Sequence, residues 1–171
     1  MSVNKQVLYN GKKELPFNVG TFIFTDGSVR TDATKVKGFR GGCGCVLFHN
    51  GKEMDSVSLP NDDTTISRME MTAMLQALIM VEKYNINHVV IASDSQLVIK
   101  GINEWMDGWK RKGWTNASKN EVENKDLWML IDDKLQKLNS NILFVWMNGH
   151  QDHAGNDRAD ELANEAVELT K

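Results

Sequence analysis

The sequence has no continuous apolar run long enough to span a membrane. Residues 1–20 also lack the central apolar block that a secretion signal requires. The chain has 171 residues, of which 41% are hydrophobic and 25% are charged, a composition typical of a single soluble globular domain. These features predict a cytoplasmic protein with no membrane partner.

Cysteine is scarce, and the only two, Cys43 and Cys45, stand two residues apart in the stretch GGCGCVLF. On a strand both side chains would point to the same face, and neighbours at this spacing make poor disulfide partners. A second pair of cysteines or histidines at zinc-finger spacing is missing as well. We therefore expect two small buried residues in a reducing compartment, rather than a disulfide or a pair of metal ligands.

An excess of basic residues is missing too, because the net charge is −3. Taken alone, this balance does not indicate a nucleic-acid partner, since the phosphate backbone is usually met by excess lysine and arginine. The cations are unevenly spread, however, and residues 109–125 contain five of them against two glutamates: Lys110, Arg111, Lys112, Lys119 and Lys125 against Glu121 and Glu123. This stretch is the candidate surface for an anionic partner.

Hydrophobic periodicity predicts an α/β domain. The expected strands are 21–26, 42–49, 53–59, 88–93 and 142–147, and the expected helices are 67–83, 95–106, 124–138 and 155–169. Asn50-Gly51 predicts a tight hairpin between the second and third strands. We expect a five-stranded mixed sheet, its first three strands antiparallel and its fourth and fifth parallel to the first, with helices on both faces. Residues 1–20 are an extension of uncertain structure, and residues 21–171 form the single domain.

Four acidic residues each have an ordinary structural explanation. Asp26 begins the Asp-Gly pair of TFIFTDGS, and such a pair after an apolar run is typical of a turn. Glu70 stands three residues after Ser67, as in a helix capping box, and Asp94 precedes a helix that it could cap. Asp160 comes early in the last helix, where the helix dipole favours a carboxylate. Taken one at a time, these structural explanations are the favoured ones.

Taken together, the four carboxylates favour a different interpretation. Asp26 and Asp94 each end a predicted strand, and parallel neighbours would bring them to one rim of the sheet. Glu70 and Asp160 begin helices next to these strands, and four converging carboxylates would repel one another unless cations lay between them. Carboxylate oxygens suit Mg²⁺ or Mn²⁺. Two such ions about 4 Å apart could activate water and stabilise the leaving oxygen in phosphodiester cleavage.

Short motifs along the chain carry a resemblance to one family. They run in order over residues 21–169: Thr25-Asp26-Gly27-Ser28, Arg68-Met69-Glu70, Ser93-Asp94-Ser95-Gln96, Gly101-Ile102 through Trp105, Gly108-Trp109-Lys110, Asn124, Asp126-Leu127-Trp128, Gly149-His150, and Asn156 through Ala163. The ordered set resembles the type 1 ribonuclease H family, and in particular its bacterial single-domain members. The resemblance implies the ribonuclease H-like version of the predicted fold.

The resemblance also implies a reaction. The family cleaves the RNA strand of RNA–DNA hybrids with two Mg²⁺ ions, leaving a 3′-hydroxyl and a 5′-phosphate, and Mn²⁺ could replace Mg²⁺. By this likeness Asp26 bridges both ions, and Glu70, Asp94 and Asp160 complete their coordination. Glu70 also matches the residue that contacts the 2′-hydroxyl, the group that distinguishes RNA from DNA. His150 matches a loop histidine that helps product leave, although without the motif a surface histidine would be the simpler explanation.

A basic handle at about residues 105–125 is implied in the same way. Its tryptophans and cations suit a nucleic-acid backbone, whereas the alternative is core tryptophans beside a solvated charged face. The expected substrate-binding residues are Trp105, Trp109, Lys110, Arg111 and Lys112 in the handle, with Ser28, Thr65, Gln96 and Asn124 elsewhere. We expect Trp114 to belong to the core. The implied partner is an RNA–DNA hybrid duplex, bound by a monomer.

The chain departs from the family pattern at the expected phosphate pocket and minor-groove contacts. Asp63 stands where an arginine is usual, and Ile66 and Ser67 replace two amide residues. Residues 29–41 form an enlarged loop whose Lys35, Lys37 and Arg40 could supply other phosphate contacts. We therefore expect weaker and more salt-sensitive hybrid binding than in a typical member. Two other hypotheses stay open: a nuclease of this fold acting on DNA, and a catalytically silent nucleic-acid-binding module.

Overall fold

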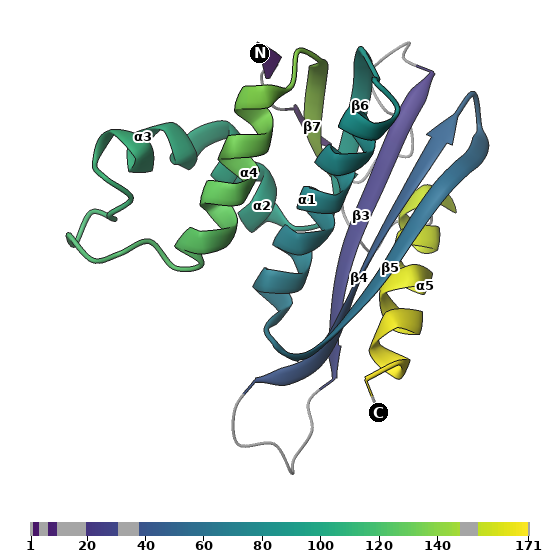
Figure 1. Ribbon diagram of the computed structural model, residues 1–171, viewed down its shortest axis with the longest axis horizontal. Coiled ribbons are helices and arrows are strands. Elements are labelled where there is room, and N and C mark those ends of the chain that lie inside the picture. The colour runs from purple at the N-terminus through teal and green to yellow at the C-terminus, as the bar shows by residue number, and fades with distance from the viewer. Residues whose placement is uncertain (1, 4–6, 10–19, 31–37, 148–153, 171) are drawn as a thin grey trace.

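The protein folds around one mixed sheet (Figure 1). The computed structural model describes residues 2–3, 7–9, 20–30, 38–147 and 154–170. Five long strands make up most of the sheet: β3 (Thr21–Arg30), β4 (Phe39–His49), β5 (Lys52–Thr64), β6 (His88–Ser93) and β7 (Asn141–Met147). Their spatial order is β5-β4-β3-β6-β7, with β3, β4 and β5 antiparallel in turn and β6 and β7 parallel to β3. The predicted fold class is confirmed.

Two short strands extend this sheet beyond the prediction. They are β1 (Ser2–Val3) and β2 (Val7–Tyr9), and both pair in parallel with β7. Part of the extension whose structure the sequence leaves uncertain therefore belongs to the sheet.

Helices cover both faces of the sheet, as Figure 1 shows. They are α1 (Ile66–Lys83), α2 (Gln96–Lys100), the π-helical turn η1 (Gly101–Trp105), α3 (Met106–Arg111), α4 (Lys125–Lys137) and α5 (Ala154–Glu168). α1 and α4 pack together on one face, and α5 lies on the other, where it is the only helix among the described residues. Among the described helices, none is both long and apolar enough to cross a membrane.

Buried apolar side chains of the described residues pack on both faces of the sheet. On the α1 face Met71, Met74 and Leu78 are fully buried, at the helical spacing that the sequence predicts. Successive residues of β3 alternate between the two faces: Ile23 packs with these methionines, whereas Phe24 packs on the α5 face. Asp26, two residues after Phe24, therefore belongs to the α5 face.

The first long strand differs from the prediction in a way that matters for Asp26. The strand does not end there but continues to Arg30, because β4 pairs with it along its whole length. The parallel pairing with β6, by contrast, ends at Thr25 opposite Ser93. Asp26 thus lies just past the end of β6 while still held in a hairpin ladder. The turn predicted at Asp-Gly is wrong, whereas Asn50-Gly51 forms the predicted tight hairpin, with φ of 51° and 81°.

Two predicted helix caps are also wrong. α1 is capped by Thr65, whose hydroxyl accepts from the N–H of Arg68 at 3.2 Å, so Ser67 and Glu70 do not form a capping box. α2 is capped by Ser95, whose hydroxyl accepts from the N–H of Val98, and not by Asp94. In each case a hydroxyl one or two residues away occupies the capping geometry.

The helix predicted at 95–106 is interrupted by the turn η1. A Cβ atom on Gly101, where this turn begins, would lie 2.0 Å from Cη2 of Trp128 on α4. The chain therefore passes directly over the Trp128 ring, which only glycine permits. The predicted burial of Cys43 and Cys45 is confirmed, and burial raises the pKa of the Cys43 thiol to about 12.

Candidate active site

Three carboxylates from separate elements meet at the end of β6. Asp26 lies on β3, Glu70 on the first turns of α1, and Asp94 directly after β6. Each offers one oxygen, and these oxygens all lie within 4.8 Å of one another. Asp26 is 5% exposed and Glu70 7%, while Asp94 is half-buried. The convergence predicted from the sequence is therefore present for these three residues.

Glycine at position 27 allows α1 to deliver Glu70 to Asp26. A Cβ atom on Gly27 would lie 2.6 Å from the backbone nitrogen of Glu70 and 2.8 Å from the carbonyl carbon of Met69. Because these are backbone atoms, any side chain at 27 would push the helix outward. The N–H of Gly27 also donates to Oδ1 of Asp26 at 2.9 Å and orients that carboxylate.

The third carboxylate is positioned by the backbone of the β6 end. The indole Nε1 of Trp146 on β7 donates to the carbonyl oxygen of Asp94 at 3.0 Å. One residue further, the N–H of Ser95 donates to Oγ of Ser93 at 3.0 Å. These bonds fix the turn in which Asp94 follows the strand.

Burial and mutual repulsion dominate the electrostatics of the three carboxylates. Burial, and then the charges of Asp94 and Asp160, raise the pKa of Asp26 to about 8. Burial and the charges of Asp26 and Asp94 raise the pKa of Glu70 well above its usual value. Among the described residues, nothing donates a hydrogen bond to the buried Oε2 of Glu70. A cluster of hard oxygen donors with an unsatisfied buried oxygen fits a divalent cation such as Mg²⁺ or Mn²⁺.

Asp160 approaches the cluster from the other face of the sheet. It is exposed on α5 and does not belong to the group within 4.8 Å, yet it lies near enough to Asp26 to raise that residue's pKa. It sits six residues after Ala154, so it is in the second turn rather than the first turn that the dipole explanation requires. His150 lies outside the described residues.

The predicted substrate-binding residues outside the handle have varied surroundings. Ser28 Oγ donates to Oδ1 of Asn164 at 2.7 Å and accepts from Arg30 at 3.1 Å. Thr65 caps α1, and Gln96 is exposed at the start of α2. The hydroxyl of Ser28 is therefore engaged with α5, whereas the side chain of Gln96 is open to solvent.

A column of three tryptophans supports the handle. The ring centroids of Trp105 and Trp109 are 5.9 Å apart, and those of Trp109 and Trp128 are 5.3 Å apart with the rings edge to face. Trp105 is 38% exposed, and Trp109 is half-buried against the core. Trp114, expected in the core, is half-buried and packs against it. The column runs from a fully buried ring to an exposed one.

The cations of the handle differ in their availability. Lys110 donates to Oδ1 of Asp132 at 3.0 Å, so its charge is paired. Arg111 and Lys112 are exposed. Sequence reasoning could not separate these three, because the partner of Lys110 lies 22 residues away on α4.

Arg68 makes contacts that its neighbours in the sequence do not predict. Its Nη1 donates to Oδ1 of Asn124 at 3.1 Å and to Oδ1 of Asp126 at 3.0 Å. Asn124 itself adopts a left-handed conformation with φ of 58° at the start of α4. The contact between Arg68 and Asn124 joins residues 56 positions apart, so no local sequence pattern predicts it.

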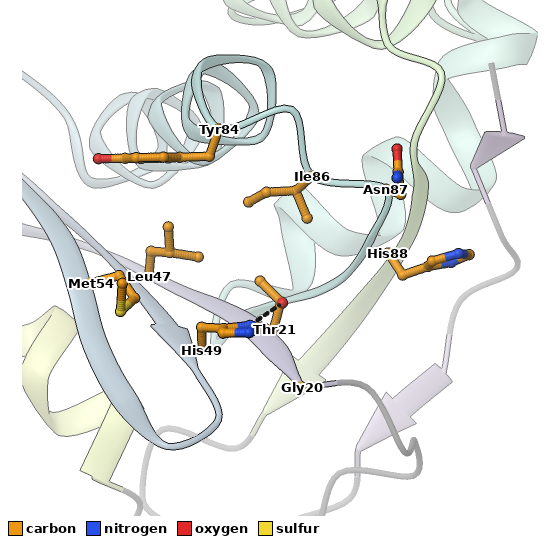
Figure 2. A pocket seen from close by; sticks show the side chains of 9 residues that line it. All are labelled: Gly20, Thr21, Leu47, His49, Met54, Tyr84, Ile86, Asn87 and His88. Atoms are coloured by element: carbon orange, nitrogen blue, oxygen red, sulfur yellow. Dashed lines mark hydrogen bonds between the residues drawn. The ribbon is translucent and has the colours of Figure 1, made fainter.

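The apolar cleft in Figure 2 is not part of this site. It has a volume of about 740 Å³ and lies between the start of β3 and the end of α1, and none of the described residues lining it is acidic. Thr21 in its wall precedes Asp26 by five residues, which separates the cleft from the carboxylates by about 17 Å along the strand. His49, which the sequence analysis did not place in any site, lines it and shares a hydrogen bond with Thr21 at 2.9 Å.

Comparison with known proteins adds to this geometry. A family model described as RNase H matches residues 18–168. Ribonuclease H of Pseudomonas putida strain F1 is 39% identical over 146 residues, which cover 85% of the chain and 92% of that relative. Ribonuclease H of Geotalea uraniireducens strain Rf4 is 42% identical over 133 residues, or 77% of the chain and 86% of that relative. Among solved structures, LC11-RNase H1 in complex with an RNA/DNA hybrid has a TM-score of 0.62 at 22% identity, covering 87% of this chain and 97% of that one.

Proposed function

The chain belongs to the ribonuclease H family, and on that premise we propose that it is an endonuclease that cleaves the RNA strand of RNA–DNA hybrids. The observation that carries the proposal is the meeting of Asp26, Glu70 and Asp94, with an unsatisfied oxygen of Glu70 buried among them. A catalytically silent binding protein has no need of such a cluster, because uncompensated buried carboxylates destabilise a fold. The catalytic unit proposed is residues 21–171, acting as a monomer.

The carboxylates are proposed to hold two Mg²⁺ ions, with Mn²⁺ as a substitute. Asp26 would contribute to holding both ions, and Glu70, Asp94 and Asp160 would complete the ligand set. Bound there, the ions supply charge neutralisation and lower the pKa of a water molecule at the scissile phosphate. Hydrolysis then forms a bond from the water oxygen to phosphorus and breaks the bond to the 3′ oxygen, which takes up a proton. The products carry a 3′-hydroxyl and a 5′-phosphate.

The chain's own residues are proposed to select the strand and release the product. Glu70, which α1 brings to the cluster, accepts a hydrogen bond from the 2′-hydroxyl beside the scissile phosphate. DNA lacks this hydroxyl. His150, which precedes α5 in the sequence, is assigned to proton transfer during product release.

The groove for the hybrid is proposed to run from the cluster to the handle. Trp105 and Trp109 offer aromatic surface to the DNA strand, and Arg111 and Lys112 face its phosphates. The other residues assigned to substrate binding are Lys110, Ser28, Thr65, Gln96 and Asn124. Exposed Asp63, at the position where the family usually has an arginine, opposes phosphate binding beside Thr65. Weaker and more salt-dependent binding is therefore expected.

The test is cleavage of an RNA–DNA hybrid compared with duplex RNA, duplex DNA and single strands, with and without Mg²⁺. We expect cleavage of the RNA strand of the hybrid alone, dependent on the metal. Asp26→Asn should abolish cleavage, while Asp133→Asn, which changes an exposed carboxylate on α4, should retain it. Preferred cleavage of duplex DNA would support the alternative nuclease, and full activity of Asp26→Asn would remove the metal assignment.

A further inference from the structure

Gly44 on β4 stands directly opposite Asp26 on β3 in the antiparallel ladder. Helix α5 packs against β4 (Figure 1), on the face of the sheet to which the alternation along β3 assigns Asp26. A Cβ atom on Gly44 would lie 2.4 Å from the carbonyl oxygen of Ala159 and 2.7 Å from the backbone nitrogen of Ala163. Cβ atoms in proteins essentially never come so close to backbone atoms. The distance between α5 and β4 is therefore one that only glycine at position 44 permits.

The residue that follows Ala159 is Asp160. The helical segment in contact with Gly44 therefore carries the one proposed metal ligand that does not come from β3, α1 or the end of β6. Any outward shift of this turn moves Asp160 away from Asp26, whose pKa already reflects its nearness. The depth of α5 over Gly44 thus decides whether the two carboxylates can share a cation.

The same helix is tied down on its other side. Ser58 Oγ on β5 donates to the carbonyl oxygen of Leu162 at 2.7 Å. Nε of Arg158 donates to Oε1 of Glu53, also on β5, at 2.9 Å. The hydrogen bonds to β5 and the close approach to β4 together fix the position of α5 on the sheet.

We propose that Gly44 is a positioning residue, whose missing side chain lets α5 bring Asp160 to the metal ligands around Asp26. The inference rests on the proposed function, because it takes Asp160 to be a ligand. It extends to the α5 face the relationship seen on the α1 face, where Gly27 admits the backbone of Glu70. Two glycines adjoin Asp26: Gly27 follows it on β3, and Gly44 stands opposite it on β4. Their missing side chains would let helices on opposite faces of the sheet bring carboxylates to Asp26.

Gly42 provides a matched control two residues along β4. A Cβ atom there would lie 2.5 Å from the carbonyl oxygen of Ala163 and 2.6 Å from Cβ of Ala166, an equally close approach to α5. Gly42 stands opposite Ser28, however, and its contacts lie farther along the helix from Asp160. Gly42→Ala and Gly44→Ala should therefore lower the stability of the fold by similar amounts but differ in their effect on Mg²⁺ affinity.

The primary measurement is Mg²⁺ affinity by calorimetry, without nucleic acid, alongside thermal melts. We expect Gly44→Ala to weaken Mg²⁺ binding about tenfold or more, the range typical of lost support for a ligand, and Gly42→Ala to change it less than about threefold. With hybrid substrate, Gly44→Ala should lower kcat and raise the Mg²⁺ requirement while leaving KM close to that of the wild type. Equal Mg²⁺ affinity in the two variants would overturn the inference.

A rescue and a second variant separate positioning from loss of structure. In the Gly44→Ala background, Asp160→Glu adds one methylene of reach and should recover part of the Mg²⁺ affinity, whereas no recovery would count against positioning. If Gly44→Ala fails to fold, Glu53→Ala loosens the same helix without adding an atom and should weaken Mg²⁺ binding measurably; unchanged affinity there would overturn the inference. Failure of the wild type to cleave hybrid would refute the proposed function alone, since the Mg²⁺ comparison does not depend on substrate.

Discussion

The guanidinium of Arg68 on α1 donates to both carboxylate oxygens of Asp126 on α4, from Nη1 to Oδ1 at 3.0 Å and from Nη2 to Oδ2 at 2.7 Å. The same Nη1 donates to Oδ1 of Asn124. This bidentate pair joins the helix that carries Glu70 to the helix that begins beside the proposed groove. It also occupies the amide oxygen of Asn124 and orients that amide, whose NH₂ group is the part that could donate to a phosphate.

Arg68→Lys is expected to loosen this link, because a lysine ammonium cannot form the planar two-point contact. The pair is partly exposed, so the loss of stability should be small, about 0.2–1 kcal/mol. KM for hybrid should rise as Asn124 loses its orientation, with kcat less affected. Steady-state kinetics and thermal melts check this. An unchanged KM would mean that Asn124 is not oriented by Arg68 in any way that matters for binding.

Asp26 should make the metal-free protein less stable as the pH rises. Its pKa is raised from 3.8 to about 8 in the folded state, so the folded protein binds more protons than the unfolded chain between these values. The free energy of unfolding should therefore fall as pH increases from about 4 to about 8, and level off above that. Asp26→Asn should remove much of this slope and melt higher than the wild type at pH 8 in EDTA.

Thermal melts in EDTA from pH 5 to pH 9 check this prediction, with each kcal/mol moving Tm by roughly 2–4 °C. Asp133→Asn serves as the control, since that carboxylate is exposed and paired with Lys137. Mg²⁺ should raise Tm of the wild type at pH 8 and leave Asp26→Asn nearly unchanged. Parallel pH curves for the wild type and Asp26→Asn would contradict the pKa direction.

The exposed cations of the handle should govern the salt dependence of hybrid binding. Each phosphate contact contributes about 0.9 to the slope of log Kd against log salt, so Lys112→Ala should reduce that slope by about 1. Lys110→Ala should reduce it less, because Lys110 is paired with Asp132. Lys52, exposed in the hairpin at the far end of the sheet, supplies a control lysine. Hybrid binding in EDTA between 50 and 200 mM salt, concentrations of the order used for such slopes, measures the difference; equal slopes for all three would refute it.

Gly101→Ala should disturb the tryptophan column. The added Cβ would lie 2.0 Å from Trp128, whose buried ring cannot move without displacing Trp109. We expect a loss of about 1–3 kcal/mol and an altered near-ultraviolet circular dichroism spectrum. Gly108→Ala is the matched control, since its nearest neighbour would be the flexible end of Arg111 at 3.9 Å. That substitution should be neutral or slightly stabilising. Similar losses of stability in both variants would contradict the close contact described between Gly101 and the Trp128 ring.

Local patterns were sufficient wherever a segment's neighbours lie close in the sequence. The β-branched run at His88–Ser93 forms the predicted strand, and the apolar spacing of Met71, Met74 and Leu78 buries the predicted face of α1. The gathering of Asp26, Glu70 and Asp94 was also predicted, although Asp26 joins it from within β3, just past the end of β6, and not from the end of its own strand. Their shared position needed only the parallel order of the sheet.

Distant contacts explain what the pattern misses. Residues 39–41 lie outside the predicted strand 42–49, yet they form the start of β4 because β3 and β5 flank them. For the same reason β3 continues past Asp26, which no local signal indicates. The glycines are required because helices from distant parts of the chain pack against them. This requirement cannot be predicted from the neighbouring sequence.

The short strands β1 and β2 are expected to protect the sheet, as follows from where they pair. Ser2 stands opposite Asn141 and Val7 opposite Val145, so β1 and β2 take up hydrogen-bonding groups that β7 would otherwise present on its outer side. An unpaired edge strand of this kind, rich in apolar and β-branched residues, is a template for joining the edges of other molecules. A shortened chain beginning at Gly20 would therefore retain every residue proposed for catalysis but expose a surface prone to aggregation. We therefore expect the pairing of β1 and β2 with β7 to favour solubility, independently of the active site.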